Sequence, residues 1–191
     1  MRIDTTNIAE VVKITPTRNL DSRGYFCELF REDIFREHVI DARFIQDNQS
    51  VSLHSGTVRG LHFQRPPFAQ GKLVNVVVGS VFDVAVDLRR ASPTFGQWAA
   101  THLSAENGAQ LWIPEGFAHG FMTLEEHTIV QYKVTAPYSA AHEGGILWND
   151  PDIGIAWPDH EAEVSISPKD RTQPRLRHLS PTLTNELMGV A

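Results

Sequence analysis

Two histidines, His62 and His119, are the residues of this chain best suited to chemistry. His62 lies six positions after Gly56, and His119 lies three positions after Gly116. An imidazole takes up and releases protons near neutral pH, and it also binds transition metals. Glycines at turns around β-branched runs indicate that strands carry both histidines, and strand alternation can aim both into one cavity. The pair therefore predicts a small-molecule site.

The elements that must position these histidines are short strands separated by turn residues. Strand signals occur at Tyr25–Phe30, Phe44–Val51, Leu73–Val78, Val81–Leu88, Gln97–Leu103, Ala109–Ile113, Gly120–Leu124 and Thr128–Val134. Charged residues interleaved with apolar ones predict a short amphipathic helix over Arg31–Val39. Many short strands, with no regular alternation of strands and helices, predict an all-β sandwich or barrel with a few short helices.

Length and composition fit a single globular domain over residues 1–191, with a polar C-terminal tail from about residue 171. The net charge of -6 gives no support for a nucleic-acid surface, because such a surface needs a basic stripe. The apolar strings are far shorter than the roughly 20 residues that cross a bilayer, so no membrane segment is expected. The single cysteine, Cys27, cannot form an intramolecular disulfide, and the reducing cytoplasm is the expected compartment.

Both histidine frames resemble the paired motifs of the cupin superfamily, whose members are small jelly-roll barrels. In metal-binding cupins the first motif continues as His-x-His with a Glu downstream. Here Gln64 takes the second ligand position, and the next glutamate is Glu106. An amide is a poor substitute for imidazole on a transition metal, and catalytic metal centres use three or more protein ligands. The sequence therefore predicts that no metal is bound and that one imidazole transfers protons. A histidine that is merely hydrogen-bonded inside a barrel is the alternative.

Longer strings carry a closer resemblance. They are Asp21–Glu28, Arg59–Gln64, Gly71–Val74, Asp83–Arg89, Ser92–Gly96, Trp112–Phe121, Tyr132–Thr135 and Trp148–Pro151. In this order they resemble the dTDP-4-dehydrorhamnose 3,5-epimerase family, over about residues 10 to 175. The resemblance implies a cupin double-stranded β-helix (jelly-roll) barrel, a dTDP-4-keto-6-deoxyhexose as substrate, inversion at C-3 and C-5, and no cofactor. A C-4 carbonyl acidifies the hydrogens at both carbons, so this reaction needs a base, an acid and a group that stabilises the enolate oxygen.

By this resemblance four residues carry the chemistry. His62 matches the proton acceptor, and Tyr132 matches the proton donor on the opposite face of the sugar. Asp170 matches the carboxylate paired with the catalytic histidine, and Lys72 matches the cation near the C-4 oxygen. Plainer alternatives are that Tyr132 is a core aromatic with a satisfied hydroxyl and that Asp170 is a solvated surface residue.

The resemblance also implies a set of substrate-binding residues. They are Arg23, Phe26, Glu28, Gln46, Asn48, Arg59, Lys72, His119, Tyr138, Glu143 and Lys169. Arg23 and Arg59 suit a diphosphate, because guanidinium groups form forked contacts with phosphate oxygens, although either could instead form a surface ion pair. Phe26 could stack on a base or fill the core. Asp83 is a candidate partner for His119, which could handle protons or orient the ligand.

Other functions stay open at the level of sequence. The nearest is an epimerase that inverts only one centre of a related dTDP-4-ketosugar. More distant ones are a metal-dependent cupin oxygenase and a non-catalytic sugar-binding barrel. The resemblance further implies a homodimer in which an N-terminal strand within Ile3–Ile14 adds to the neighbouring subunit's sheet, since an extended segment can pair with an open sheet edge.

Overall fold

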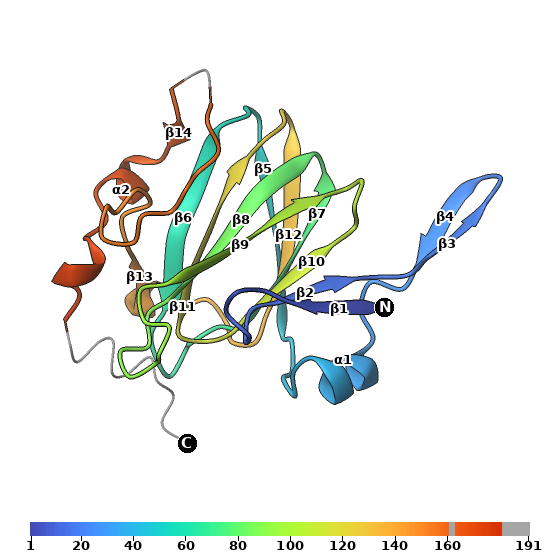
Figure 1. The fold of residues 1–191 in the computed structure, drawn as a ribbon, viewed down its shortest axis with the longest axis horizontal. Coiled ribbons are helices and arrows are strands. Elements are labelled where there is room, and N and C mark those ends of the chain that lie inside the picture. The colour runs from blue at the N-terminus through green and yellow to red at the C-terminus, as the bar shows by residue number, and fades with distance from the viewer. Residues whose placement is uncertain (161–162, 181–191) are drawn as a thin grey trace.

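Two facing β-sheets form the body of the molecule in the computed structural model, which describes residues 1–160 and 163–180 (Figure 1). The first sheet contains, in order across it, β1 (Arg2–Thr5), β2 (Val12–Thr15), β10 (Gln110–Ile113), β7 (Lys72–Val78), β12 (Thr128–Val134) and β5 (Gln46–Ser52). The second contains β13 (Glu143–Gly145), β6 (Thr57–Gln64), β11 (Phe117–Thr123), β8 (Ser80–Asp87) and β9 (Trp98–Ser104), and β14 (Ser165–Ile166) also pairs with β6. From β5 to β8 and from β10 to β13, successive strands alternate between the sheets, so the predicted all-β jelly-roll barrel is confirmed.

Most predicted strands lie close to observed ones, and the predicted helix is α1 (Glu32–His38). Two strands differ in ways that matter for the site. β6, which carries His62, was not among the predicted strands, because Arg59 and Gly60 interrupt its run of strand-forming residues. β11 begins at Phe117 rather than Gly120, so His119 lies inside the strand and not before it. The expectation that strands carry both histidines is confirmed.

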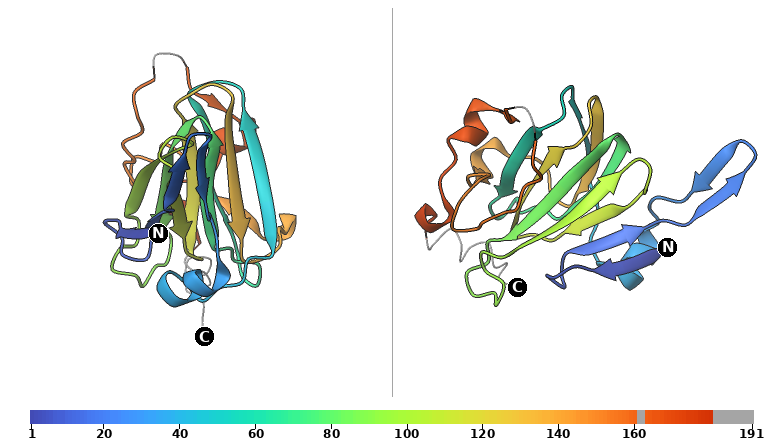
Figure 2. Two further views of the ribbon diagram at one scale, coloured as in Figure 1. Left: turned by 90° about the vertical axis from the view of Figure 1, so that its right-hand side faces the viewer. Right: turned by 45° about the horizontal axis from the view of Figure 1, so that its top comes forward.

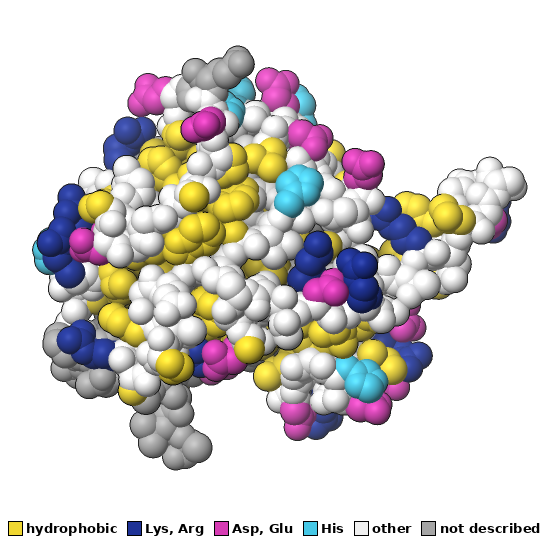
Figure 3. Space-filling view, viewed as in Figure 1, with side chains coloured by type: hydrophobic (Ala, Val, Ile, Leu, Met, Phe, Trp, Pro, Cys, Tyr) yellow, Lys and Arg dark blue, Asp and Glu magenta, His cyan; other side chains and the backbone are white. Residues whose placement is uncertain are grey.

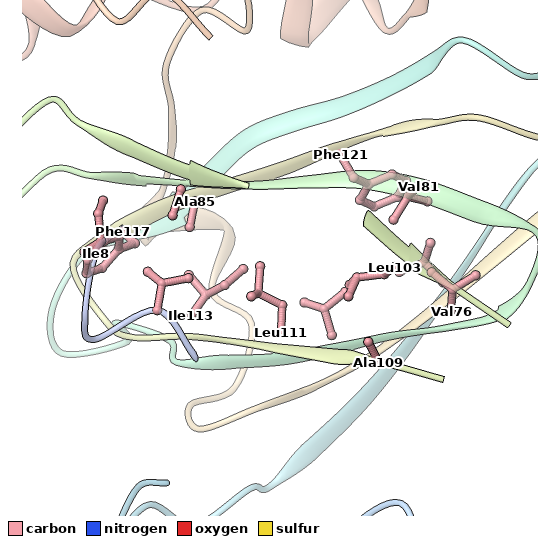
Figure 4. Close-up of a cluster of buried hydrophobic side chains, with 14 residues drawn as sticks. Ile8, Val76, Val81, Ala85, Leu103, Ala109, Leu111, Ile113, Phe117 and Phe121 are labelled. Carbon is pink, nitrogen blue, oxygen red and sulfur yellow. The ribbon is translucent and has the colours of Figure 1, made fainter. Parts of the chain in front are cut away.

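A cluster of buried apolar side chains fills part of the space between the sheets (Figure 4). Leu111 of β10 belongs to the first sheet, whereas Val81 of β8 and Phe121 of β11 belong to the second. All three side chains are almost fully buried, as alternate positions on the inner faces of two packed sheets should be. Phe121 also borders the cavity described below, so this core supports one side of the site.

A hairpin of β3 (Arg18–Asp21) and β4 (Gly24–Cys27) projects from the body of the molecule (Figures 1 and 2). The predicted turn at Asp21–Gly24 is confirmed, and Gly24 adopts φ +133°, a conformation that other residues rarely take. β4 ends at Cys27, three residues before the predicted end of that strand at Phe30. Hydrophobic side chains cover part of this arm (Figure 3), and Leu20 and Phe26 are 80% and 72% exposed.

The N-terminal segment Ile3–Ile14 pairs within its own chain. β1 and β2 form an antiparallel hairpin, with Ile3 opposite Ile14, and β2 continues the first sheet beside β10. β2 therefore takes the edge that β10 offers in the same chain, whereas addition of an N-terminal strand to a neighbouring subunit's sheet stays a prediction. β1 is left as the outermost strand on that side of the sheet.

The remaining helices are single turns: η1 (Ala140–His142), α2 (Pro168–Arg171) and η2 (Leu176–His178). No helix in the described ranges is long and apolar enough to cross a membrane. Residues 171–180 differ from the polar tail expected there, since Leu176 and Leu179 pack against an apolar cluster that includes Leu61 of β6. The rest of the expected tail, residues 181–191, lies outside the described residues.

Candidate active site

A cavity of about 460 Å³ opens between the two sheets, beside a compartment of about 250 Å³. His62, Lys72 and Tyr132 line both spaces, so the two are parts of one site. Predicted site residues that line the larger part only are Arg59, His119, Lys169 and Asp170, and those that line the smaller part only are Gln46, Asn48, Tyr138 and Glu143. Eleven of the fourteen predicted site residues therefore lie together around one cavity.

The strand register explains how these side chains reach the same space. His62 of β6 lies directly opposite His119 of β11, so both side chains leave the same face of the second sheet. In the first sheet, Tyr132 of β12 lies opposite Asn48 of β5 on one side and Val74 of β7 on the other. The two histidines and the tyrosine thus approach the cavity from opposite sheets.

His62 and Asp170 form a short hydrogen-bonded pair. The His62 Nε2 atom lies 2.6 Å from Asp170 Oδ1, and the carboxylate is almost fully buried. Asp170 is held in turn, because its second oxygen accepts the Gly60 N–H at 3.3 Å and its own N–H donates to the Ser167 hydroxyl that caps α2. With Nε2 engaged by the carboxylate, Nδ1 is the nitrogen of His62 left to exchange a proton with a ligand.

The environment of Asp170 favours its charged form. Burial pushes the pKa of the Asp170 carboxyl upward, but the hydrogen bond and charge of His62, with the bonds from Gly60 and Ser167, lower it overall. An ionised carboxylate at this distance stabilises an imidazolium, so the pair is arranged for His62 to accept a proton. The predicted partnership of these two residues is present in the geometry.

Lys72 and Tyr132 add a cation and a phenol to the same cavity. Burial lowers the pKa of the Lys72 ammonium to about 8, against the opposing charges of Asp83 and Glu143. Its Nζ reaches the His62 carbonyl oxygen at 3.4 Å. Burial raises the pKa of the Tyr132 hydroxyl, although the positive charge of Arg59 opposes the shift. At neutral pH the site therefore offers an ammonium and a protonated phenol.

His119 and Asp83 form a second imidazole–carboxylate pair, as the sequence suggested. His119 Nε2 lies 3.0 and 3.1 Å from the two oxygens of Asp83, and Asp83 is fully buried. Burial lowers the pKa of His119, and the charges of Lys72 and His62 add to that effect, while Asp83 opposes it. The neutral imidazole is favoured, which suits a residue that orients a ligand through hydrogen bonds.

At one rim of the cavity three predicted ligand contacts form a chain. Lys169 forms an ion pair with Glu143, with 2.5 Å between Nζ and Oε2, and the Tyr138 hydroxyl donates to the same oxygen at 3.1 Å. These contacts link the segment before β13 to the helix that carries Asp170. Arg59, in the larger compartment, is held by the Ser52 hydroxyl and the Val51 carbonyl oxygen, so its guanidinium is fixed at the cavity wall.

Three predicted substrate contacts lie away from the cavity of their own chain. Arg23 forms an exposed ion pair with Asp21, and Phe26 is exposed on the β3–β4 hairpin. Glu28, just after that hairpin, lies 3.8 Å from Arg31 in another exposed ion pair. None of the three lines either compartment. Their place on the projecting arm is decided by the tertiary structure, which the local sequence does not reveal.

The cavity also includes residues that sequence reasoning missed, among them Ser50 and Ser167. Ser50 lies two positions after Asn48 on β5, so strand alternation could have identified it as a further inward-facing residue. Its hydroxyl is buried and has no hydrogen-bond partner in the structure, which marks it as a polar group available to a ligand. Ser167 precedes Pro168, a pattern typical of a helix N-cap, but that signal does not show that the cap lies at the cavity.

The second cupin ligand position is occupied by a buried amide that serves the protein backbone. Gln64 bonds to backbone groups of Phe68, Pro137 and Ser139. Among the residues that the structure describes, no three His, Cys, Asp or Glu side chains are grouped as metal ligands.

Comparison with known proteins is consistent with this geometry. Residues 5–178 match the sequence profile of the dTDP-4-dehydrorhamnose 3,5-epimerase family. A relative of that name from Sinorhizobium fredii is 57% identical over 179 residues, which cover 94% of this chain and 91% of the relative. The profile match runs from the last residue of β1 to the end of η2, so it includes every element from β2 to η2.

Solved structures agree with the sequence comparison. The dTDP-6-deoxy-D-glucose-3,5-epimerase of Legionella pneumophila, in complex with dTDP-4-keto-L-rhamnose, is 45% identical with a TM-score of 0.91, over 95% of this chain and 96% of that one. A 3'-monoepimerase from Streptomyces bikiniensis, in complex with dTDP-quinovose, is 33% identical with a TM-score of 0.84, over 91% of this chain and 87% of that one. On its sequence, its cupin-type barrel and the residues gathered in its cavity, this chain belongs to the dTDP-4-dehydrorhamnose 3,5-epimerase family.

Proposed function

We propose that this protein inverts C-3 and C-5 of a dTDP-4-keto-6-deoxyhexose by removing and returning protons through an enolate. The observation that carries the proposal is the arrangement of His62 and Tyr132. The two line one cavity from opposite sheets, with the carboxylate of Asp170 on the imidazole and the ammonium of Lys72 in the same space. The named activity of the family and the ketosugar in the Legionella complex support this substrate class.

Each of these residues has a defined part in the proposed reaction. His62 takes the proton from the carbon next to the ketone through Nδ1, and Asp170 stabilises the imidazolium that forms. The electron pair of the broken C–H bond moves onto the C-4 oxygen, where the charge of Lys72 stabilises the enolate. Tyr132 then gives its proton to the opposite face of the same carbon, and solvent restores the phenol and the neutral imidazole. A raised pKa keeps the Tyr132 hydroxyl protonated until that step.

Inversion at both centres is favoured over inversion at one by the pattern of relatives. The 3'-monoepimerase shares the fold at 33% identity, whereas the Sinorhizobium protein named as a 3,5-epimerase reaches 57%. A metal-dependent oxygenase fits less well, because the amide of Gln64 is already bonded to the backbone. A non-catalytic sugar-binding barrel also fits less well, because a buried imidazole–carboxylate pair opposite a phenol is typical of proton transfer and is not needed for binding alone.

We also propose that the active form is a homodimer, in which the β3–β4 hairpin and the residue that follows it carry Arg23, Phe26 and Glu28 to the site of the partner subunit. The hairpin stands away from its own cavity and exposes apolar side chains, which are features of a segment that packs on another chain (Figure 3). Sedimentation should give a dimer at micromolar concentration, and Phe26→Asp should shift it towards monomer. A wild-type monomer under these conditions would contradict this part of the proposal.

Two broader expectations accompany the function. Both sheets draw strands from distant parts of the sequence, which supports a single domain over residues 1–191. The unpaired Cys27 suits a reducing compartment, in keeping with a cytoplasmic enzyme.

The decisive experiment is incubation with dTDP-4-keto-6-deoxyglucose in deuterated water, followed by NMR of the product. We expect deuterium at C-3 and C-5 with inversion at both carbons, and deuterium at one carbon alone would instead indicate a single-centre epimerase. His62→Ala should abolish exchange, while His102→Ala, which removes an exposed imidazole outside the cavity lining, should not. Unchanged turnover in His62→Ala would remove the proposed base, and no turnover in wild type would favour a binding protein.

A further inference from the structure

Gln64 occupies a place in the fold from which it can act on the active site indirectly. It lies two positions after His62 on β6 and directly opposite Glu143 of β13. Its side chain is buried, and its amide makes three hydrogen bonds to backbone groups. Nε2 donates to the carbonyl oxygens of Phe68 and Pro137 at 2.8 and 3.0 Å, and Oε1 accepts the Ser139 N–H at 2.6 Å. Three bonds to backbone at one buried amide are a strong positional constraint.

Two of these bonds lie on either side of Tyr138. Pro137 and Ser139 are its neighbours in the chain, so Gln64 fixes the backbone immediately before and after it. Two further glutamines continue the pattern: Gln70 donates to the Ala136 carbonyl oxygen at 2.7 Å, and Gln46 accepts the Tyr138 N–H at 3.2 Å. Each residue from Ala136 to Ser139 therefore has a backbone group held by a glutamine side chain.

The Tyr138 side chain depends on this support because little else holds it. It is 57% exposed, and its hydroxyl bonds to Glu143, which lies on β13 next to β6. Tyr138 still lines the smaller compartment, with His62, Lys72 and Tyr132. A largely exposed ring takes its position mainly from its backbone, so the bonds at residues 137 and 139, together with the hydroxyl bond to Glu143, set the direction in which Tyr138 faces the cavity.

We infer that Gln64 is a positioning residue for substrate binding, which acts by fixing the backbone on both sides of Tyr138. The inference rests on the proposed function, in which Tyr138 is one of the residues that bind the nucleotide-sugar, and dTDP is the part of that substrate used as the probe below. Gln64 lines the smaller compartment, but both of its amide hydrogens and its Oε1 atom bond to the backbone, so its role towards the ligand is indirect. Its effect is to present the Tyr138 ring to the ligand in one orientation, so that binding does not have to order the loop.

A double-mutant cycle distinguishes a positioning role of Gln64 from a purely structural one. Gln64→Met keeps a similar length but removes all three bonds, and Tyr138→Ala removes the ring that those bonds position. Binding of dTDP alone is measured by calorimetry for wild type, both single variants and the double variant. We expect Gln64→Met and Tyr138→Ala each to raise the Kd roughly tenfold, which is about 1.4 kcal/mol, and the double variant to stay within about twofold of Tyr138→Ala.

Steady-state kinetics should show an effect of Gln64→Met on KM and not on kcat. In Gln64→Met the KM for the ketosugar nucleotide should rise roughly tenfold while kcat stays within about twofold of wild type, because His62, Tyr132 and Lys72 keep their places. Gln97→Met is the matched control, since it removes an exposed glutamine bonded to a backbone carbonyl outside the cavity lining, and both constants should be unchanged.

Several outcomes would overturn the inference. Additive effects in the cycle, or a fall in kcat with unchanged Kd, would mean that Gln64 acts on stability or chemistry and not through Tyr138. If Gln64→Met does not fold, the same cycle with Gln64→Asn, whose amide is one methylene shorter and cannot reach both Pro137 and Ser139, decides the question by the same criterion. A wild-type protein that does not bind dTDP would refute the nucleotide part of the proposed function, whereas normal wild-type binding with an additive cycle would refute this inference alone.

Discussion

Replacing Asp170 by asparagine tests the centre of the proposed mechanism. The substitution keeps the shape of the side chain but removes the charge that lies 2.6 Å from His62 Nε2. An amide can still accept the Nε2 proton through its oxygen. Its nitrogen then faces the Gly60 N–H, which now donates to the second carboxylate oxygen at 3.3 Å, so two donors would meet. The variant therefore weakens both the imidazolium and the orientation of the ring.

The size of the effect follows from the burial of the pair. The Asp170 side chain is only 6% exposed, so solvent screens the interaction little. A hydrogen bond to a charged group contributes about 1.5–3 kcal/mol. If that stabilisation belongs mainly to the protonated imidazole formed in the reaction, kcat should fall between about 10-fold and about 150-fold, since about 1.36 kcal/mol corresponds to a tenfold change in rate.

The assay is the initial rate of deuterium incorporation from solvent at C-3 and C-5, with Asp152→Asn as control. Asp152 forms a partly exposed ion pair with Arg177 outside the cavity lining, so its loss should change the rate less than twofold. A folded Asp170→Asn protein that exchanges within twofold of wild type would refute the reasoning. So would an equal loss of rate in Asp152→Asn, because the effect would then not depend on the imidazole.

The same substitution should also change how the free energy of unfolding depends on pH. The folded-state pKa of Asp170 is lowered from its ordinary value, so the carboxylate stabilises the fold above the unfolded pKa of about 3.9 and loses that contribution as the pH falls through the folded value. Wild type should lose more stability than Asp170→Asn when denaturant unfolding is compared at pH 6 and below pH 4. Parallel losses in the two proteins would contradict the assigned direction of the shift.

Three further substitutions extend these tests. Burial lowers the pKa of Lys72 to about 8, so its charge is lost as the pH rises through that value, and kcat/KM of wild type should fall above about pH 8. An arginine stays charged there, so the activity that remains in Lys72→Arg should persist to higher pH. Tyr132→Phe should lower the yield of inverted product roughly 100-fold while deuterium still enters from solvent, because His62 can return a proton to the face from which it came; equal loss of exchange and inversion would contradict separate roles. In Gly60→Ala the new Cβ would lie 2.6 Å from the Gly120 Cα atom at φ +134°, so we expect a loss of at least about 1–3 kcal/mol in denaturant unfolding, and wild-type stability would show that the two strands have room to separate.

Much of the fold could be predicted from the sequence because its signals are local. Alternating apolar residues between glycine and proline turns identify strands such as β7 and β12 within a residue, since side chains on a strand alternate between faces. The signal fails where a functional residue interrupts it. Arg59 and Gly60 interrupt the strand signal of β6. Arg59 lines the cavity, and Gly60 allows the close approach of β11. The strand that carries His62 is therefore the one that local propensity identifies least well.

The sequence by itself determined the set of chemical groups and the sheet-rich class of the protein, since residue types and their short-range spacing are written directly in the chain. Only the tertiary structure decided which groups meet. His62 and Asp170 are 108 positions apart, and their contact depends on where α2 docks against β6. Arg23, Phe26 and Glu28 were all expected at the same site, yet the first two lie on the β3–β4 hairpin and Glu28 just after it, away from the cavity of their own chain. Strand periodicity fixes the face on which a side chain lies, but the pairing of distant segments fixes its neighbours, and that pairing results from the packing of the whole barrel.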